Sequence, residues 1–232
     1  MSIFLEKGSQ TAMEEDRMIV QKPLSELIAE ELRQRIWNKQ VQFGERLLET
    51  ELAEMFDVSR STIREALKIL EQEQLVISKA RKGTYVTEFT DEDLAEIIEL
   101  RTLMEAHAFQ DALPELGREH FAKLSEILDE MKTAAGKGKW GDLFDLDMKL
   151  HGYIVNQSGN SRIIRIYESI QVQIRAYLVH LDQYYSSPHS FYAEHRELVD
   201  ALKTKDPQKV NRSVRDHISY VEEKLLQTKQ KQ

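Results

Sequence analysis

Apolar residues recur at helical spacing along most of this chain, and the first clear repeats lie on either side of residue 58. Leu52, Ala53 and Phe56 share one face of a helix. Asp57 and Val58 then interrupt the spacing. This pattern predicts a short helix that ends in a turn.

A second helix is predicted to begin near Arg60, because the hydroxyl of Ser59 can cap its first backbone N–H groups. Its apolar stripe consists of Ile63, Ala66, Leu67 and Leu70. Two β-prone runs follow, at residues 75–77 and 84–87, with a basic segment between them. An earlier amphipathic helix opens at Pro23. Three helices and a hairpin in this order predict a winged helix-turn-helix, with the hairpin as the wing.

From residue 89 onward the chain consists of amphipathic helical patterns. Thr90, with Asp93 three residues later, resembles a capping box, and Pro188 and Pro207 each stand at the first position of a helix. The predicted helices lie near residues 92–113, 118–135, 140–156, 161–183, 188–204 and 207–227. The fold class is therefore mainly α: a winged helix-turn-helix of three helices and a small hairpin, then an all-α bundle of about six helices.

The bulk composition fits two modest domains. The chain has 232 residues, 41% of them hydrophobic, and no cysteine. No apolar run approaches the roughly 18 residues of a membrane span, and no targeting segment is evident, so we expect a cytoplasmic protein without membrane contact. We expect a flexible tail at residues 1–20, the winged domain at residues 21–88 and the helical domain at residues 89–228.

Positive charge is concentrated around the predicted second helix and the wing. Between Ser59 and Lys82, six Lys or Arg residues stand against three Glu, a local net charge of +3 in a chain of net charge −8. Arg60, Ser61 and Arg64 lie outside the apolar stripe. Arginine can bind a guanine edge through two hydrogen bonds, while Ser, Thr and Lys can bind phosphates. The segment is therefore predicted to bind the major groove of double-stranded DNA.

Residues 47–86 resemble the winged helix-turn-helix of the GntR family of bacterial transcription regulators. The resemblance rests on Val58-Ser59-Arg60, Arg64-Glu65-Ala66-Leu67 and Gly83-Thr84-Tyr85-Val86. It implies DNA contacts by Arg60, Arg64 and Gly83. Thr50 stands where the family has another base-contacting arginine, so the operator sequence does not follow from the resemblance. The predicted DNA-binding residues are Thr50, Ser59, Arg60, Ser61, Thr62, Arg64, Lys82 and Gly83.

Ionisable side chains interrupt the apolar stripes of three bundle helices. Asp147 and His151 lie one turn apart on one stripe, His195 on a second and His217 on a third. A single inward histidine is usually a hydrogen-bonded core residue, so the inference rests on the whole set. An unpaired buried carboxylate is costly, and a cation would neutralise it while the imidazoles donate neutral nitrogens. We predict one divalent ion per chain at these four residues, with zinc favoured and nickel, manganese or iron as alternatives.

Arg101 occupies an inward position on the first bundle helix. One interpretation is an ion pair with Glu105, one turn further on. The other is a fork that binds a ligand carboxylate whose second oxygen binds the metal. Asn160, Arg175 and Tyr177 are further candidates for the ligand pocket, on position alone.

The helical part resembles the ligand-binding FCD domain of the FadR-type GntR regulators, in its metal-binding class. The matching segments are Glu99-Leu100-Arg101 with Glu105, Asp147-x-x-x-His151, Ser158-Gly159-Asn160, Glu194-His195 and Asp216-His217. In that class an aspartate and three histidines hold a divalent metal, small carboxylates bind at the metal, and the proteins act as homodimers. With the winged domain, the resemblance covers about residues 22–226.

The residues and the resemblance together predict a transcription regulator and not an enzyme. We expect a repressor whose binding to operator DNA is modulated by a small carboxylate or hydroxycarboxylate at the metal site. Two alternatives stay open. The cation itself could be the effector of a metal-sensing regulator, or the helical part could be a metalloenzyme fused to a DNA-binding domain, although no further inward general base is evident.

Overall fold

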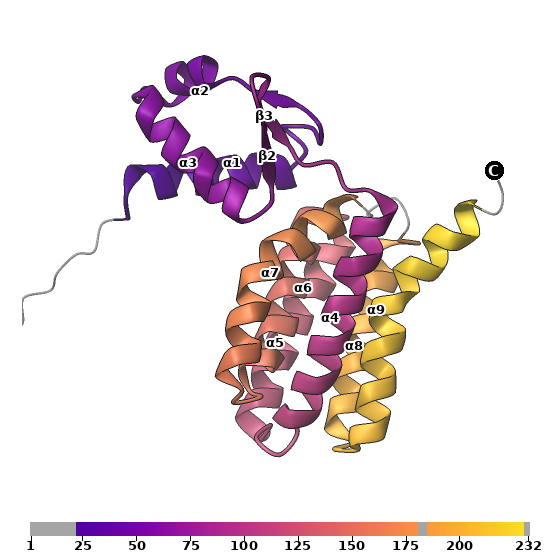
Figure 1. Ribbon diagram of the computed structural model, residues 1–232. Helices are drawn as coiled ribbons and strands as arrows, with labels where there is room; N and C mark the ends of the chain where they lie inside the picture. Colours follow the sequence, from indigo (N-terminus) through magenta and orange to yellow (C-terminus); the bar gives the residue numbers. More distant parts are fainter. Residues whose placement is uncertain (1–21, 181–184, 230–232) are drawn as a thin grey trace, which may run out of the picture.

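The computed structural model describes residues 22–180 and 185–229. A small N-terminal unit of helices and strands sits at one end of an elongated helical bundle (Figure 1). The fold class predicted from the sequence, a winged helix-turn-helix followed by an all-α bundle, is confirmed. The predicted flexible tail at residues 1–20 lies outside the described residues.

The N-terminal unit combines three helices with a small sheet. Its elements are α1 (Leu24–Trp37), β1 (Arg46–Leu47), α2 (Glu49–Phe56), α3 (Arg60–Gln72), β2 (Val76–Lys79) and β3 (Gly83–Val86). α2 ends because Asp57 adopts the left-handed conformation, at φ 52°. α3 begins where the cap predicts it, since the side chain of Ser59 accepts a hydrogen bond from the backbone N–H of Thr62 at 3.2 Å.

The wing contains one strand more than the predicted hairpin. The sheet is antiparallel in the order β1-β3-β2, and β1 pairs Arg46 with Tyr85 and Leu47 with Thr84. A strand of two residues has no periodicity of its own, so only its pairing with β3 defines it. The added strand ties the wing to the start of α2.

The bundle starts at a capping box. The hydroxyl of Thr90 accepts from the N–H of Asp93 at 3.1 Å, and Asp93 Oδ2 accepts from the N–H of Thr90 at 2.8 Å. The bundle helices are α4 (Asp91–Ala112), α5 (Arg118–Gly136), α6 (Trp140–Asn156), α7 (Ser161–His180), α8 (Pro188–Lys203) and α9 (Pro207–Lys229). The side chain of Ser187 caps α8 by accepting from the N–H of Ser190 at 3.0 Å. Local capping chemistry thus sets where α4 and α8 begin.

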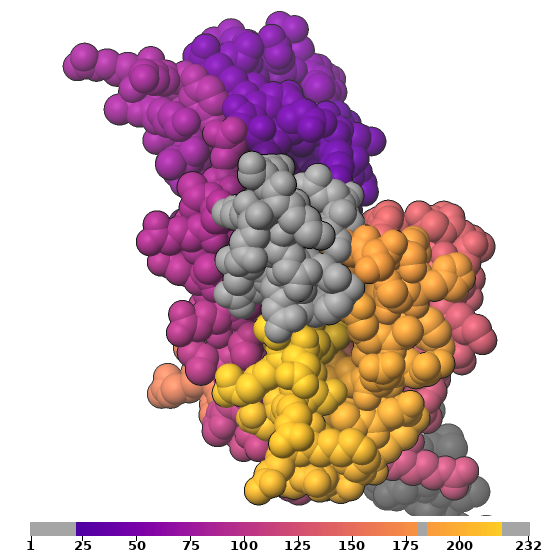
Figure 2. Space-filling view, turned by 90° about the vertical axis from the view of Figure 1, so that its right-hand side faces the viewer, coloured from indigo at the N-terminus to yellow at the C-terminus, as the bar shows by residue number. Residues whose placement is uncertain are grey.

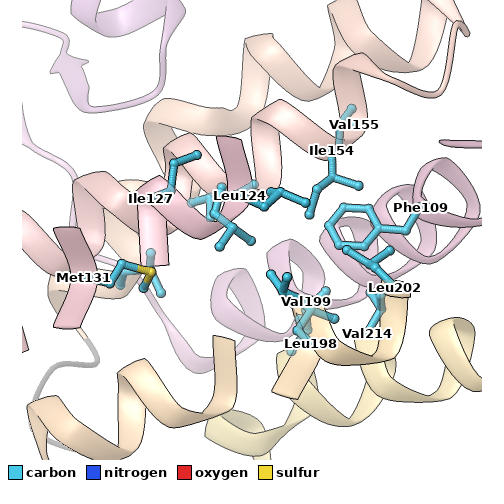
Figure 3. Packing of buried hydrophobic residues seen from close by; sticks show 14 of the residues in the cluster. Phe109, Leu124, Ile127, Met131, Ile154, Val155, Leu198, Val199, Leu202 and Val214 are labelled. Atoms are coloured by element: carbon cyan, nitrogen blue, oxygen red, sulfur yellow. The ribbon is translucent and has the colours of Figure 1, made fainter. Parts of the chain in front are cut away.

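Apolar faces from all six bundle helices form one core. Figure 3 shows part of it, with Phe109, Leu124, Ile127, Met131, Ile154, Val155, Leu198, Val199, Leu202 and Val214. Burying a side chain of this kind stabilises the fold by about 1.5–3 kcal/mol. The packing brings α4 against α6 and α9, and α8 against α9. The inward faces of these four helices therefore meet.

Arg175 of α7 lies at the joint between the two units. Its guanidinium carbon is 5.3 Å from the ring centroid of Trp37, at the end of α1, and 5.2 Å from that of Phe144 in α6. Its Nε donates to Asp145 Oδ1 at 2.7 Å, and its Nη2 donates to the carbonyl oxygen of Gly141 at 3.1 Å. Arg175 thus joins the last turn of α1 to the first turns of α6.

Candidate metal centre and nucleic-acid interface

Four ionisable side chains converge inside the bundle. Asp147 and His151 project from successive turns of α6, His195 projects from α8 and His217 from α9. One candidate ligand atom of each side chain lies within 4.8 Å of those of the other three. The first three residues are buried and His217 is partly buried. The packing of three helices therefore brings together the residues that the sequence pattern directs inward.

Hydrogen bonds at Nδ1 fix the orientation of two of these imidazoles. His195 Nδ1 lies 2.7 Å from the carbonyl oxygen of Phe191, which can only accept, so Nδ1 carries the proton. His151 Nδ1 lies 2.5 Å from Glu105 Oε2, and the same reasoning assigns it as the donor. In each neutral ring, Nε2 is then left with a lone pair.

The Nε2 atoms of these two rings face other polar atoms of the cluster. His195 Nε2 lies 2.8 Å from Asp147 Oδ1, and His151 Nε2 lies 3.2 Å from His217 Nε2. Acceptors at these distances repel one another unless a proton or a metal cation lies among them. Three imidazole nitrogens and a carboxylate form a donor set that suits zinc and neighbouring transition metals. The residues present therefore fit a divalent cation.

The charge states of the cluster also suit a metal. Burial acts to raise the pKa of Asp147, but attraction to charged neighbours, first of all the guanidinium of Arg101, outweighs it and holds that pKa well below its usual value. Burial, with smaller effects from the neighbouring histidines, holds the pKa of His217 well below its usual value. Asp147 is therefore a carboxylate and His217 a neutral ring at neutral pH, which are the forms that bind metals.

Arg101 of α4 lies beside the cluster, with 4% of its side chain exposed. Its Nε donates to Glu105 Oε1 at 2.8 Å, and its Nη2 donates to Asp147 Oδ2 at 3.1 Å. The ion pair that the spacing of Arg101 and Glu105 indicated is thus present. Contact with Asp147 also places the guanidinium where a carboxylate bound beside the cluster would meet it.

A small internal cavity of about 10 Å³ adjoins the cluster, with room for roughly one water-sized occupant. Arg101, Tyr177 and Tyr185 line it, together with Glu194. Burial raises the pKa of Glu194 to about 7. Of the predicted pocket residues, Arg101 and Tyr177 therefore lie at the cluster.

Asn160 and Arg175, the other two predicted pocket residues, lie elsewhere. Asn160 precedes α7, and its Oδ1 accepts from the backbone N–H groups of Arg162 and Ile163 at 3.2 and 3.3 Å. Arg175 is held at the joint between the two units. Neither Asn160 nor Arg175 is among the described residues that line the cavity. Their contact with a ligand stays a prediction from position alone.

The candidate nucleic-acid interface is formed by α3, the start of α2 and the wing. The predicted contact residues with exposed side chains or backbone there are Thr50, Ser59, Arg60, Ser61, Arg64, Lys82 and Gly83. Thr62 is partly buried, and its hydroxyl lies 2.8 Å from that of Ser59. Arg64 Nε donates to Glu49 Oε2 at 2.8 Å, with 60% of the Arg64 side chain exposed. These groups leave a polar, largely basic face opposite the buried stripe of α3.

The tip of the wing depends on Gly83, which has a φ of 101°. Side chains other than hydrogen are strained at such a φ. A Cβ at this position would also lie 3.2 Å from Arg46 Nε. Gly83 therefore lets the backbone of the wing approach Arg46, a cation on β1 that the sequence analysis did not select.

Two parts of this chain match known families. Residues 24–86 match the gntR family of bacterial regulatory proteins, and residues 96–220 match the FCD domain. This chain belongs to the GntR family. The regulator thus combines a GntR winged helix-turn-helix with an FCD domain.

Curated relatives of this GntR-family regulator include two gluconate operon transcriptional repressors. The one from Bacillus licheniformis is 33% identical over 208 residues, covering 85% of this chain and 83% of that protein. The one from Bacillus subtilis (strain 168) is 32% identical over 205 residues, with the same coverage of 85% and 83%. The solved structure of E. coli McbR/YncC has a TM-score of 0.74 at 22% identity, covering 90% of this chain and 99% of that chain. That likeness shows a shared fold.

The family match and the named relatives make this GntR-family protein a transcription regulator and not an enzyme. The metalloenzyme alternative is therefore set aside. Among the residues that the structure describes, no helix combines the length and apolar character needed to cross a bilayer.

Two residues of the regulator's helical domain have roles that the sequence analysis did not identify. Glu105 contacts His151 as well as Arg101. Tyr167 of α7 donates its hydroxyl to Glu105 Oε1 at 2.6 Å. The spacing of Arg101 and Glu105 indicated an ion pair for Glu105 but not its contact with His151. Tyr167 stands 62 positions from Glu105, and only the packing of α7 on α4 brings the two together.

Proposed function

We propose that this regulator represses transcription by binding an operator, and that it releases the operator when a small carboxylate binds at a divalent metal in the FCD domain. The observation that carries the proposal is the convergence of four donor side chains, with His195 Nε2 directed at Asp147 and His151 Nε2 at His217. Repression is supported by the two relatives that are named as repressors.

The metal that we propose is zinc, one ion per chain, with nickel, manganese or iron as alternatives. Asp147, His151, His195 and His217 would hold it. A bound ion of this kind supplies positive charge and a coordination position for an oxygen of the effector. The chain's own part is to keep the imidazole Nε2 atoms available, since acceptors hold the Nδ1–H groups of His151 and His195.

The charges of the site support an anionic effector. Three buried side chains carry full charges, Arg101 positive and Glu105 and Asp147 negative, so their net charge is −1. A divalent cation would change this sum to +1, and a monocarboxylate would neutralise it. The proposed effector is a small carboxylate or hydroxycarboxylate that contacts Arg101. Gluconate is the first acid to test, because the two relatives regulate a gluconate operon by name.

We propose that the effector enters through a groove between α8 and α9. The groove has a volume of about 540 Å³, and Glu194 and His217 line both this groove and the inner cavity. Figure 2 shows α8 and α9 side by side on one face of the bundle. Acidic, basic and hydroxyl side chains line most of the groove, among them Arg212 and Ser213. Such a lining suits a hydroxylated acid better than an alkyl chain.

The DNA-bound form is proposed to be a homodimer that reads two half-sites about one helical turn apart. In each copy α3 would enter the major groove, with the wing beside it. Leu100 and Leu103 of α4 and Ile166 of α7 are 39%, 53% and 52% exposed, and we propose these apolar side chains as pairing contacts. Light scattering on the complex of the protein with a single-operator duplex measures this state.

Regulation requires that the effector and the operator favour different arrangements of the two units, with a coupling free energy of about 1–3 kcal/mol. Contacts run from the cluster to the joint. The carbonyl of Phe191 holds His195, and the ring of Phe191 lies 5.6 Å from that of Phe144. Phe144 in turn packs on Arg175, which contacts Trp37 of α1. These contacts support a path from the metal site to the DNA-binding unit.

Operator binding in three ligand states tests the proposed function. An operator duplex selected from a random library is titrated with metal-free protein, with zinc-loaded protein, and with zinc-loaded protein plus gluconate or another hydroxycarboxylate. We expect the acid to weaken operator binding about 5–150-fold in the zinc-loaded state only. A response to zinc alone, with no further effect of any acid, would instead favour the metal-sensing regulator. Equal affinity in all states would contradict both.

A further inference from the structure

Glu105 is a carboxylate with no exposed side-chain surface, and three donors meet it. Arg101 Nε lies 2.8 Å from its Oε1, and the hydroxyl of Tyr167 lies 2.6 Å from the same oxygen. His151 Nδ1 lies 2.5 Å from Oε2. The donors come from α4, α7 and α6 respectively. One side chain therefore joins three helices at a single buried point.

Packing alone does not explain why a carboxylate stands at this buried position. Apart from Arg101, the buried residues near it on the inward side of α4 are apolar, among them Ile98, Ala108 and Phe109. Moving an ionised carboxylate into such surroundings is costly, and apolar replacements of buried ion pairs are often neutral or stabilising. The hydrogen bonds of Glu105 point to what it does, because two of its partners belong to the candidate metal site.

We propose that Glu105 is a positioning residue of the metal site: it keeps His151 Nε2 unprotonated and directed at the cluster, and it holds Arg101 against Asp147. The inference rests on the proposed function, since it assigns Glu105 a role toward the same ion and the same effector. Glu105 is not itself a ligand, because its Oε2 accepts from His151 Nδ1 and its Oε1 from Arg101 and Tyr167, whereas the Nε2 of His151 faces His217.

Tyr167 sets the orientation of this carboxylate. Burial, followed by the charge of Glu105, raises the pKa of Tyr167 well above its usual value, so its hydroxyl stays protonated and can donate. Arg101 and Tyr167 together use Oε1 and leave Oε2 for the imidazole of His151. Tyr167 therefore acts on the metal site by orienting Glu105, and Glu105 acts on it by orienting His151.

Glu105→Gln tests the role with almost no change in volume. The amide nitrogen can only donate, so it would face an N–H or O–H donor, and the acceptor for His151 Nδ1–H or for Arg101 and Tyr167 is lost. We expect the zinc affinity of the folded variant to fall about 10–100-fold, the range for loss of an outer partner of a metal-binding histidine. Tyr167→Phe should lower the affinity less. Glu126→Gln is the matched control, since Glu126 is an exposed carboxylate that pairs with Lys123 on α5.

Two measurements decide the matter. Zinc affinity is obtained by competition with a chelator, and the tautomer of His151 in the metal-free protein is read from the ¹⁵N shifts of its ring. We expect wild type and Glu126→Gln to show the Nδ1–H form, and Glu105→Gln to lose that preference together with affinity. A purely structural role of Glu105 would not change the tautomer.

The contrary outcomes are distinct. If wild type binds zinc and folded Glu105→Gln binds it equally well with the same His151 tautomer, the inference on Glu105 is wrong while the proposed function stands. If wild type takes up no zinc, the proposed function fails and the inference fails with it. If Glu105→Gln does not fold, Tyr167→Phe decides by its zinc affinity: an unchanged affinity there would overturn the inference.

Discussion

Two arginine–carboxylate pairs of this regulator have the same length and opposite surroundings. Arg64 on α3 and Glu49 on α2 are 2.8 Å apart, and their side chains are 60% and 35% exposed. Arg101 and Glu105 on α4 are also 2.8 Å apart, but their side chains are 4% and 0% exposed. The two pairs therefore do not differ in distance, but they differ in how far their side chains are exposed to solvent.

The surroundings determine what each arginine can do. In water an exposed ion pair contributes little to stability, so Arg64 can exchange Glu49 for a phosphate or a base edge at little cost. In the bundle Arg101 is the cation for two buried carboxylates, Glu105 and Asp147, and it cannot leave them unpaired. Arg64 is thus available to DNA, whereas Arg101 maintains the buried site that is proposed to receive the effector.

The largest expected effect comes from removing the buried arginine. Arg101→Met leaves two carboxylates without their cation, so the free energy of unfolding of the metal-free protein should fall by about 3–5 kcal/mol. Urea unfolding followed by circular dichroism measures this. Arg64→Met is the matched control and should leave the unfolding midpoint unchanged. A similar midpoint shift for the two variants would remove the contrast between the pairs.

Removing the exposed arginine should act on DNA binding instead. Arg64→Ala is expected to weaken operator binding by about 1–3 kcal/mol, because a base-edge or phosphate contact is lost while the buried stripe of α3 is untouched. Fluorescence anisotropy with a labelled operator duplex gives the affinity. Unchanged affinity would show that α3 is not the recognition helix.

Ser59 is both a predicted DNA contact and the N-cap of α3, so its structural role can be measured apart from DNA binding. Its hydroxyl caps α3 through the N–H of Thr62. Ser59→Ala should therefore lower the free energy of unfolding by about 1 kcal/mol, the usual value for a lost N-cap. Urea unfolding tests this. Ser61→Ala serves as the control, because the hydroxyl of Ser61 contacts that of Ser59 at 2.7 Å but is not the acceptor for the N–H of Thr62. If the two variants are equally stable, the cap at Ser59 contributes nothing.

The smallest effect is expected at the partner of Arg64. Glu49→Gln removes a negative charge beside the proposed DNA surface and frees the guanidinium. Operator affinity should rise a few-fold at low salt, and the gain should shrink as salt is added. Anisotropy titrations at two salt concentrations measure it. A loss of affinity would mean that Glu49 orients Arg64 for DNA rather than merely occupying it.

Local signals allowed much of this fold to be predicted from the sequence. The hydroxyl of Ser59, the capping box at Thr90 and the prolines that open α8 and α9 act within a few residues, so they appear directly in the sequence. Helical spacing likewise directs Asp147, His151, His195 and His217 inward, because the period of a helix fixes which residues share a face. Whether these four hold a metal stays a proposal.

Contacts between distant segments could not be predicted in this way. β1 exists only because Arg46 and Leu47 pair with β3. The bond from Tyr167 to Glu105 depends on how α7 packs on α4, and the position of Arg175 between Trp37 and Phe144 depends on how the two units meet. Periodicity assigns a side chain to a face but does not say which face of which helix it will contact.

Metal uptake by the purified protein tests the central proposal most directly. Protein stripped with a chelator is dialysed against buffered zinc, and the bound metal is counted by mass spectrometry in wild type and in His195→Ala/His217→Ala. The account predicts about one zinc per chain in wild type and almost none in the double variant, since only two of the four donors remain. A full equivalent in the double variant, or none in wild type, would contradict it.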